Sequence, residues 1–288
     1  MKDATKYIVN TYSYTIRGGV EPCLEELSDA GFTAIELMTH PGHGWPSELD
    51  SAGRRRLAAA LRRTGIEVAS ISQPNIDLNL TASAPEMREH SLTRLLQLAE
   101  LGGEIGAPAV QVGPGKISPL LPDPPQEVRG RLFRALDALV EAGRKTGVRV
   151  LLENMPVSFL AKCADLRAMI DDYGSDAIGM TYDIANAEFV GDEHAAAIQV
   201  CGDLLEMVHI SDTGHQEYRH DPVGQGVIDF PAVGAALAAS SWAGRPVIEV
   251  IGRSANPLAE IVESIERLEA MDWLGRSLPG TNQQEVRG

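Results

Sequence analysis

Four short segments each end an apolar run with a residue that can bind a metal ion: 148-VRVLLE-153, 178-IGMTYD-183, 205-LEMVH-209 and 246-PVIE-249. Each run has the length of a buried parallel strand, and a loop and a helical pattern follow it. In a closed parallel barrel the last side chains of the strands point into one shared mouth. We therefore expect Glu153, Asp183, His209 and Glu249 to converge there on one divalent ion.

Strand-like and helix-like patterns alternate along the whole chain. Gly65 and Gly147 each end a helical pattern ahead of a strand, and Pro85 indicates a helix start that Ser83 would cap. Units of roughly 35 residues in strict alternation are the signature of a (β/α)8 barrel. The expected strands are 7–13, 33–38, 66–72, 108–113, 148–153, 178–183, 205–210 and 246–251; the expected helices are 20–30, 51–64, 85–105, 126–146, 161–172, 193–203, 230–239 and 257–272.

An α/β fold of the TIM-barrel type is favoured over an open doubly wound sheet, which usually carries a glycine-rich phosphate turn after an early strand. The sequence has no such turn, and no linker divides it. We expect one domain over residues 1–274, followed by a polar, disordered tail at 275–288. Three long segments after strands, at 39–49, 113–125 and 211–228, are expected to be functional loops.

The bulk composition excludes several classes of function. A net charge of −15 repels phosphate backbones, so we expect no nucleic-acid partner. No apolar run is long enough to span a membrane, and the N-terminus lacks the apolar core of a signal peptide. Three widely spaced cysteines indicate reduced thiols rather than a disulfide framework. Together these features predict a cytoplasmic protein.

A histidine with three carboxylates forms an oxygen-dominated ligand set. Such a set favours Mn²⁺, with Co²⁺ or Mg²⁺ as alternatives, over a structural zinc, which prefers thiolates. The structural alternative is that Glu153 and Glu249 cap buried strands through ion pairs. Four candidate ligands from the last four strands are difficult to place without a cation, because unpaired buried carboxylates are very costly.

The segments LLENM, YDIANA, VHISD, PVIEV and GQGVIDF resemble the xylose isomerase-like barrel superfamily, often described as sugar phosphate isomerases/epimerases. The resemblance to its ketose 3-epimerases implies that Glu153, Asp183, His209 and Glu249 bind one ion. It also implies a cis-enediolate mechanism, in which the ion chelates a ketose carbonyl and the neighbouring hydroxyl. One glutamate would remove the carbon-bound proton and the other would return one on the opposite face, with Glu153 as the expected base.

The chain departs from the epimerase pattern at Asn186, where family members commonly carry a substrate-binding histidine. An amide can donate a hydrogen bond to a hydroxyl but cannot titrate. Family members also place an arginine after strand seven, which suggests Arg219 or His215 as a substrate ligand, and His220 is a weaker candidate for an additional metal ligand. Further candidates for substrate contact are Glu36, His40, Trp45 and Lys116.

Other functions of the same scaffold remain open at this point. A dehydratase or lyase acting on a keto-inositol or dehydroshikimate begins with the same proton abstraction and needs an acid such as His215 or His40. The apurinic endonuclease branch uses three zinc ions and extra histidines, where this chain has Gln111 and Asn186. A non-catalytic binding protein would be expected to lose a glutamate. We expect a small, unphosphorylated ketose or cyclic polyol as substrate, and a homo-oligomer is possible.

Overall fold

The computed structural model describes residues 4–275, in which eight strands form a closed barrel in chain order, as predicted. Every neighbouring pair is parallel, and the pairing of the first strand with the last closes the barrel. The strands are β1 (Ile8–Asn10), β2 (Ala34–Met38), β3 (Glu67–Ser72), β4 (Ala109–Val112), β5 (Arg149–Glu153), β6 (Ile178–Asp183), β7 (Leu205–Ile210) and β8 (Val247–Ile248).

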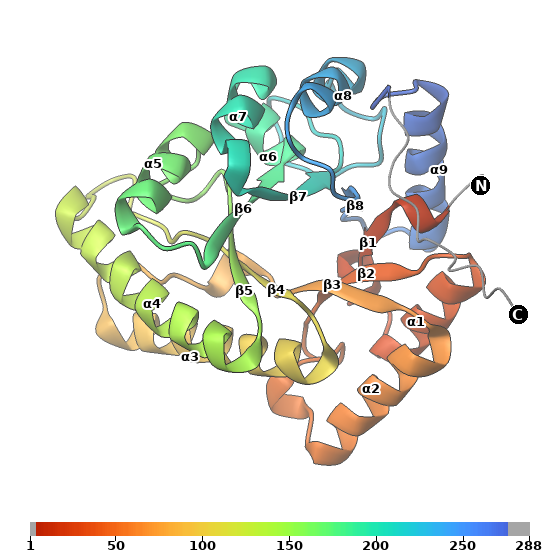
Figure 1. Ribbon diagram of the computed structural model, residues 1–288, viewed down its shortest axis with the longest axis horizontal. Helices are drawn as coiled ribbons and strands as arrows, with labels where there is room; N and C mark the ends of the chain where they lie inside the picture. The colour runs from red at the N-terminus through yellow and green to blue at the C-terminus, as the bar shows by residue number, and fades with distance from the viewer. Residues whose placement is uncertain (1–3, 276–288) are drawn as a thin grey trace, which may run out of the picture.

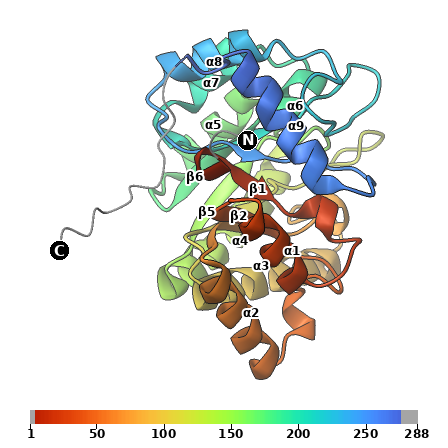
Figure 2. The same ribbon diagram turned by 90° about the vertical axis from the view of Figure 1, so that its right-hand side faces the viewer.

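Helices surround this barrel, and the last of them lies beside the first strand in both views (Figures 1 and 2). Their apolar sides pack against the outer face of the strands in one continuous core. The α-helices are α1 (Val20–Asp29), α2 (Ser51–Thr64), α3 (Pro85–Ile105), α4 (Pro125–Thr146), α5 (Cys163–Tyr173), α6 (Ile184–Phe189), α7 (His194–Cys201), α8 (Phe230–Ala239) and α9 (Pro257–Ala270); the 3-10 helices are η1 (Ala4–Lys6), η2 (Tyr12–Tyr14), η3 (Pro46–Glu48), η4 (Asn75–Asp77) and η5 (Gly202–Leu204).

Six strands are shorter than the sequence predicted, β1 and β8 by the most, and one α-helix was missed. After β1 the side chain of Asn10 accepts a hydrogen bond from the Tyr12 amide (2.8 Å), and the chain turns into η2. After β8 the amide of Ile251 donates to the carbonyl of His220 in a loop rather than to a strand (2.8 Å). The missed helix, α6, begins directly after β6 because the Asp183 side chain caps it.

Helix ends follow the expected backbone chemistry at some positions and not at others. Gly65 and Gly147 adopt the left-handed conformation (φ 68° and 76°) at the ends of α2 and α4, as predicted. Pro85 begins α3, but Ser83 does not cap it: the N-cap residue is Ala84, and the Ser83 hydroxyl bonds to Asp123 instead. The prediction of Ser83 as cap was wrong because a distant carboxylate accepts its hydrogen bond.

The barrel interior has an apolar layer below a polar layer. Alternate residues of a strand point to the same face, so one strand can contribute a residue to each layer. Leu151 precedes Glu153 by two positions, and Met207 precedes His209 in the same way. The apolar layer is a small separate cluster, and above it lie the polar side chains at the carboxyl ends of the strands. That cluster consists of Ile8, Ala34, Ala109, Leu151, Met207 and Val247.

Three other predictions concern the chain as a whole. Cys23, Cys163 and Cys201 are free and buried, as expected for reduced thiols. Within residues 4–275, no helix combines the length and the apolar character needed to cross a lipid bilayer. The predicted tail at 275–288 lies, apart from Gly275, outside the described residues.

Candidate metal centre and active site

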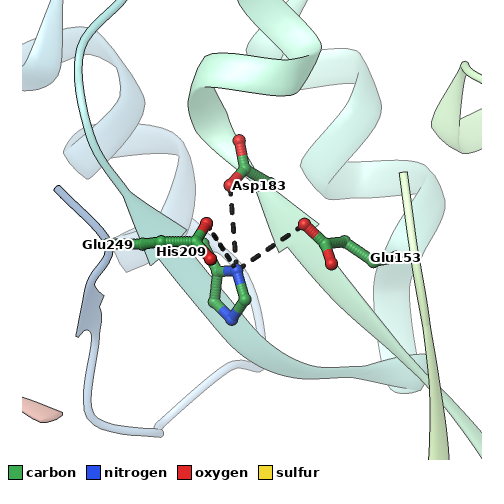
Figure 3. Close-up of side chains that lie close together, drawn as sticks. All are labelled: Glu153, Asp183, His209 and Glu249. Carbon is green, nitrogen blue, oxygen red and sulfur yellow. Dashed lines mark hydrogen bonds and ion pairs between the residues drawn. The ribbon is translucent and has the colours of Figure 1, made fainter. Parts of the chain in front are cut away.

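The four predicted ligands meet at the carboxyl ends of β5 to β8. One potential ligand atom from each of Glu153, Asp183, His209 and Glu249 lies within 4.8 Å of the others, and all four residues are buried. His209 Nδ1 lies 3.7 Å from a carboxylate oxygen of Glu153, 3.7 Å from one of Asp183 and 3.1 Å from one of Glu249. Figure 3 shows the three carboxylates directed at this nitrogen from different sides. The predicted convergence is confirmed.

Asp183 shows why this group fits a cation. Its Oδ1 accepts a hydrogen bond from the Asn186 amide (2.6 Å), which caps α6. Its Oδ2 is buried and has no hydrogen-bond partner among the described residues. Burial, reinforced by the nearby Glu249, raises the pKa of Asp183 to about 7 despite the opposing effect of His220. An unpartnered buried carboxylate oxygen facing two others is a natural ligand for a divalent ion.

The other members of the group are perturbed in the same sense. Burial also raises the pKa of Glu153 and of Glu249, although His209 partly opposes it. For His209 burial alone would lower the pKa, but the surrounding carboxylates, Glu36 first among them, hold it well above its usual value. In the described part of the chain no lysine or arginine pairs with these carboxylates, and their ion-pair partners are the histidines His209 and His220.

Next to the four candidate ligands lies a further buried carboxylate, Glu36, which β2 supplies. It accepts hydrogen bonds from the side chains of Asn10 on β1, Ser70 on β3 and Gln111 on β4. His209 Nε2 lies 3.3 Å from the same group. Burial opposes ionisation, but the charge of His209 and these hydrogen bonds outweigh it and lower the pKa of Glu36. The Glu36 carboxylate is therefore ionised at neutral pH and lies at the bottom of the site.

A cavity of about 450 Å³ opens above these residues. Candidate metal ligands and other polar side chains line one part of it, and apolar side chains line another. Its walls come largely from the segments after β3, β5 and β7. The polar lining includes Tyr12, Glu36, Gln73, Glu153, His209, Tyr218, Arg219, His220 and Glu249; the apolar lining includes Met38, Pro74, Ile76, Met155, Pro156, Val157 and Ile251.

Comparison with known proteins identifies the family. The model of the xylose isomerase-like TIM barrel family matches residues 24–271. The chain belongs to this family. Among its relatives, the L-ribulose-5-phosphate 3-epimerase UlaE of Salmonella paratyphi C is 22% identical over 248 residues, which are 85% of this chain and 84% of that protein. A probable endonuclease 4 of Oleidesulfovibrio alaskensis is 29% identical over 231 residues, 73% of this chain and 76% of that protein.

A solved relative supports the architecture. The crystal structure of a D-tagatose 3-epimerase-like protein superposes with a TM-score of 0.77 and 22% identity, covering 93% of this chain and 98% of that one. Likeness at this level of identity shows the fold alone. Sugar epimerases are thus found among both the sequence relatives and the structural neighbours of this xylose isomerase-like barrel, which supports an enzyme.

The residues predicted to bind substrate in this barrel do not all reach the cavity. Arg219 lines it, but its guanidinium pairs with Glu217 (2.5 Å) and its side chain is 56% exposed. His215 is 65% exposed and bonds to Glu188 (2.6 Å) instead. Asn186 is buried beside Glu153, and Glu36 lies on the floor.

The three remaining candidates are absent from the cavity lining. Trp45 stacks under the guanidinium of Arg94, 4.0 Å from the ring centre. The ammonium of Lys116 donates to two backbone carbonyl oxygens, both at 2.6 Å. His40 bonds to the carbonyl of Pro41 (3.1 Å). Their roles in binding substrate stay predictions, without a position in the cavity to support them.

Sequence reasoning passed over several residues that do line the cavity, chief among them Gln73, Tyr218 and Tyr12. Gln73 follows β3 directly, so its position at a strand end was a usable signal. Tyr218 lies in the long segment after β7 that was predicted to be functional, but nothing in that segment distinguished it from its neighbours. His220 also lines the cavity, with Nδ1 3.5 Å from a carboxylate oxygen of Glu249.

Proposed function

We propose that this protein is a divalent-metal-dependent epimerase or isomerase of a ketose or related polyol, acting by proton transfer through a cis-enediolate. The buried group formed by Glu153, Asp183, His209 and Glu249 at the base of a sugar-sized cavity carries this proposal. The names of the relatives, which include L-ribulose-5-phosphate and tagatose 3-epimerases, support the reaction class.

The four ligands suit Mn²⁺ first, with Co²⁺ and Mg²⁺ as alternatives, because oxygen donors dominate the set. Such an ion would polarise a ketose carbonyl and its neighbouring hydroxyl, which acidifies the adjacent C–H group. The protein positions the ligands rigidly, since each belongs to the end of a barrel strand.

The two glutamates differ in how their oxygens are engaged. Glu153 Oε1 faces His209 and accepts a hydrogen bond from Asn186, whereas no hydrogen bond from the described residues reaches its Oε2. In Glu249 one oxygen faces His209 and the other accepts a hydrogen bond from Asn10 (2.9 Å). The free oxygen makes Glu153 the better base. Figure 3 places the two glutamates on opposite sides of His209, as proton removal and return on opposite faces of a flat intermediate would require.

The substrate is proposed to be unphosphorylated, unlike the sugar named for UlaE. Of the residues that line the cavity, Arg219 is the one lysine or arginine, and it is already paired with Glu217. Lys116 lies outside the lining. A phosphate group would therefore meet glutamates without a compensating cation.

Two other reaction classes find less support. A dehydratase needs an acid near the leaving hydroxyl, and the candidates His40 and His215 do not line the cavity. An endonuclease of the three-zinc type needs further imidazoles where Gln111 and Asn186 supply amides, and the net charge of −15 disfavours DNA. A cytoplasmic location and a homo-oligomer stay predictions.

Proton exchange in D₂O tests the proposal. Metal-loaded protein incubated with unphosphorylated ketoses should place deuterium at the carbon next to the carbonyl in recovered substrate or product. Chelation should stop the exchange, and Glu153→Gln should stop it while metal binding is retained. Loss of water with exchange but without epimerisation would move the assignment to a dehydratase. Absence of exchange with every enolisable ketose and inosose would overturn proton transfer altogether.

A further inference from the structure

The side-chain amide of Asn186 has only one orientation that fits its surroundings. Its Nδ2 lies 2.9 Å from the backbone carbonyl oxygen of Asn154, which can only accept, and 3.2 Å from Glu153 Oε1. The amide oxygen therefore faces the hydroxyl of Tyr218 at 2.6 Å. Because that oxygen cannot donate, Tyr218 must be the donor. Both amide protons of Asn186 are already used, which leaves none for a substrate.

The same reasoning extends to His220. The single proton of the Tyr218 hydroxyl points to Asn186, so the 2.9 Å contact between that hydroxyl and His220 Nε2 must be donated by the histidine. This holds whether the imidazole is neutral or charged. His220 Nδ1 lies 2.9 Å from the hydroxyl of Ser211, which completes its bonding. A row of hydrogen bonds thus runs in one direction, from His220 through Tyr218 and Asn186 to Glu153.

The loop that carries Tyr218 is built to hold it in place. The carboxylate of Asp212 accepts backbone N–H bonds from Thr213 (3.0 Å), Gly224 (2.8 Å) and Ile228 (3.2 Å). The tyrosine ring itself lies against Phe189 of α6, with ring centres 5.3 Å apart. Tyr218 as a whole is 43% exposed and lines the cavity, but its hydroxyl donates to Asn186.

We propose that Tyr218 is a positioning residue for the base: it locks the Asn186 amide so that Glu153 Oε1 is held toward the metal group and Oε2 is left for the substrate. The proposal rests on the function proposed above. It assigns Asn186 to the support of Glu153 rather than to contact with the substrate. A positioned carboxylate matters because proton transfer requires the base to be within hydrogen-bond reach in the correct orientation.

Tyr218→Phe removes the hydroxyl and keeps the ring against Phe189. We expect kcat to fall by about ten- to a hundredfold, the loss typical of a positioning partner. KM and metal affinity should stay within about threefold of the wild type. Tyr173→Phe is the matched control, because it removes a hydroxyl bonded to Asp137 (3.0 Å) away from the cavity, and it should change neither kcat nor KM.

A double-mutant cycle and a measurement on the resting protein complete the test. In an Asn186→Leu background, Tyr218→Phe should cause no further loss of kcat, because the tyrosine acts through the amide. By NMR, Tyr218→Phe should shift the side-chain amide resonances of Asn186, with or without turnover. Additive losses, or an unchanged kcat in Tyr218→Phe, overturn the positioning role and leave the proposed function standing. Failure of the wild type to exchange protons overturns the proposed function. Unshifted Asn186 resonances in Tyr218→Phe would show that Tyr218 does not bond to Asn186, and would overturn the inferred row of hydrogen bonds.

A separate observation concerns Gln73. Its side chain is 2% exposed and lines the cavity, yet neither its amide nitrogen nor its amide oxygen has a partner among the described residues. A buried amide without partners is destabilising, so such groups usually bind a ligand or water. The adjoining part of the lining includes Pro74 and Ile76, which have no side-chain hydrogen-bonding group, and Asn75 between them. We infer that the side-chain amide of Gln73 forms a hydrogen bond with a hydroxyl group of the uncharged sugar substrate.

Gln73→Leu tests this inference, again on the basis of the proposed function. The variant should lose about tenfold in kcat/KM, while the ligand-free protein should melt at the same or a higher temperature, because an unpartnered amide is removed. Against a series of monodeoxy ketoses, the variant and the wild type should behave alike only for the sugar that lacks the hydroxyl read by Gln73. A lower melting temperature with unchanged kcat/KM would show a structural role instead and overturn the inference.

Discussion

Two buried carboxylates at the mouth of the barrel, Glu36 on β2 and Asp183 on β6, have opposite surroundings. Glu36 receives hydrogen bonds from three neighbouring side chains, and its pKa is lowered. Asp183 keeps one oxygen without any partner among the described residues, and its pKa is raised to about 7. Glu36 in the first half of the barrel therefore has donors from the protein itself, whereas Asp183 in the second half keeps one oxygen that could bind a cation. The number of hydrogen-bond partners, rather than burial or the presence of a carboxylate, distinguishes Glu36 from the candidate metal ligand Asp183.

The largest expected effect is loss of the metal in Asp183→Asn. The N-cap bond to Asn186 requires an oxygen at the Oδ1 position, so the new NH₂ group takes the place of the unpartnered Oδ2 and cannot bind a cation. Metal affinity should fall by roughly a thousandfold, beyond the 10- to 100-fold typical of outer partners. Calorimetric titration with Mn²⁺ measures this, and affinity within tenfold of the wild type would remove Asp183 from the ligand set.

The pH dependence of stability should differ between apo and metal-loaded protein. The pKa of Asp183 is about 7 in the folded apo protein and near 3.9 in the unfolded chain. Between pH 4 and pH 7 the folded state therefore keeps a proton on Asp183 that the unfolded state has lost. Stability of the apo protein should therefore fall as pH rises through this window, by at most about 4 kcal/mol for this group. The raised pKa values of Glu153, Glu249 and His209 act in the same direction.

Urea denaturation of chelator-treated protein at pH 5 and pH 8 measures that slope. Asp183→Asn should reduce it, and saturating Mn²⁺ should abolish it in the wild type, since the ion favours the ionised carboxylates. Apo protein that is equally stable at both values of pH would contradict the assignment of Asp183 as an unsatisfied acid.

Glu36→Gln should weaken folding by about 2–3 kcal/mol, equally with and without metal. An amide NH₂ in place of either oxygen would meet a donor, because Asn10 and Gln111 already point their NH₂ groups at this position. Glu104→Gln, which removes only an exposed ion pair with Arg54, should change stability by less than about 1 kcal/mol. If Glu36→Gln lowered the free energy of unfolding only when metal is present, Glu36 would instead contribute to metal binding.

The smallest expected effect is that of Glu249→Ala on the apo protein. The change removes the hydrogen bond from Asn10 but also relieves repulsion with Glu153 and Asp183, so the free energy of unfolding should change by less than about 1 kcal/mol. Activity and metal affinity should nevertheless be lost. Thermal melts in chelator give the comparison, and a clear destabilisation would show that the bond to Asn10 dominates.

The candidate site was predictable where the position of a strand end decided it, and not where loops did. His215 and Tyr218 lie three residues apart in the same segment, yet one bonds to Glu188 at the surface and the other reaches Asn186 in the cavity. No periodicity in a loop predicts such a difference. For the same reason Trp45 and Lys116, both plausible by residue type, do not line the cavity, whereas Gln73 does.

The sequence alone determined the barrel and its four candidate ligands, because strand patterns repeat in chain order and parallel strands deliver their last residues to one mouth. Only the tertiary structure decided which buried polar groups have hydrogen-bond partners. The donors to Glu36 and Glu249 come from strands far away in the chain, and Asn10 lies 239 positions before the glutamate that it contacts. Hydrogen bonds across such separations depend on barrel closure and side-chain orientation, which a linear pattern does not encode.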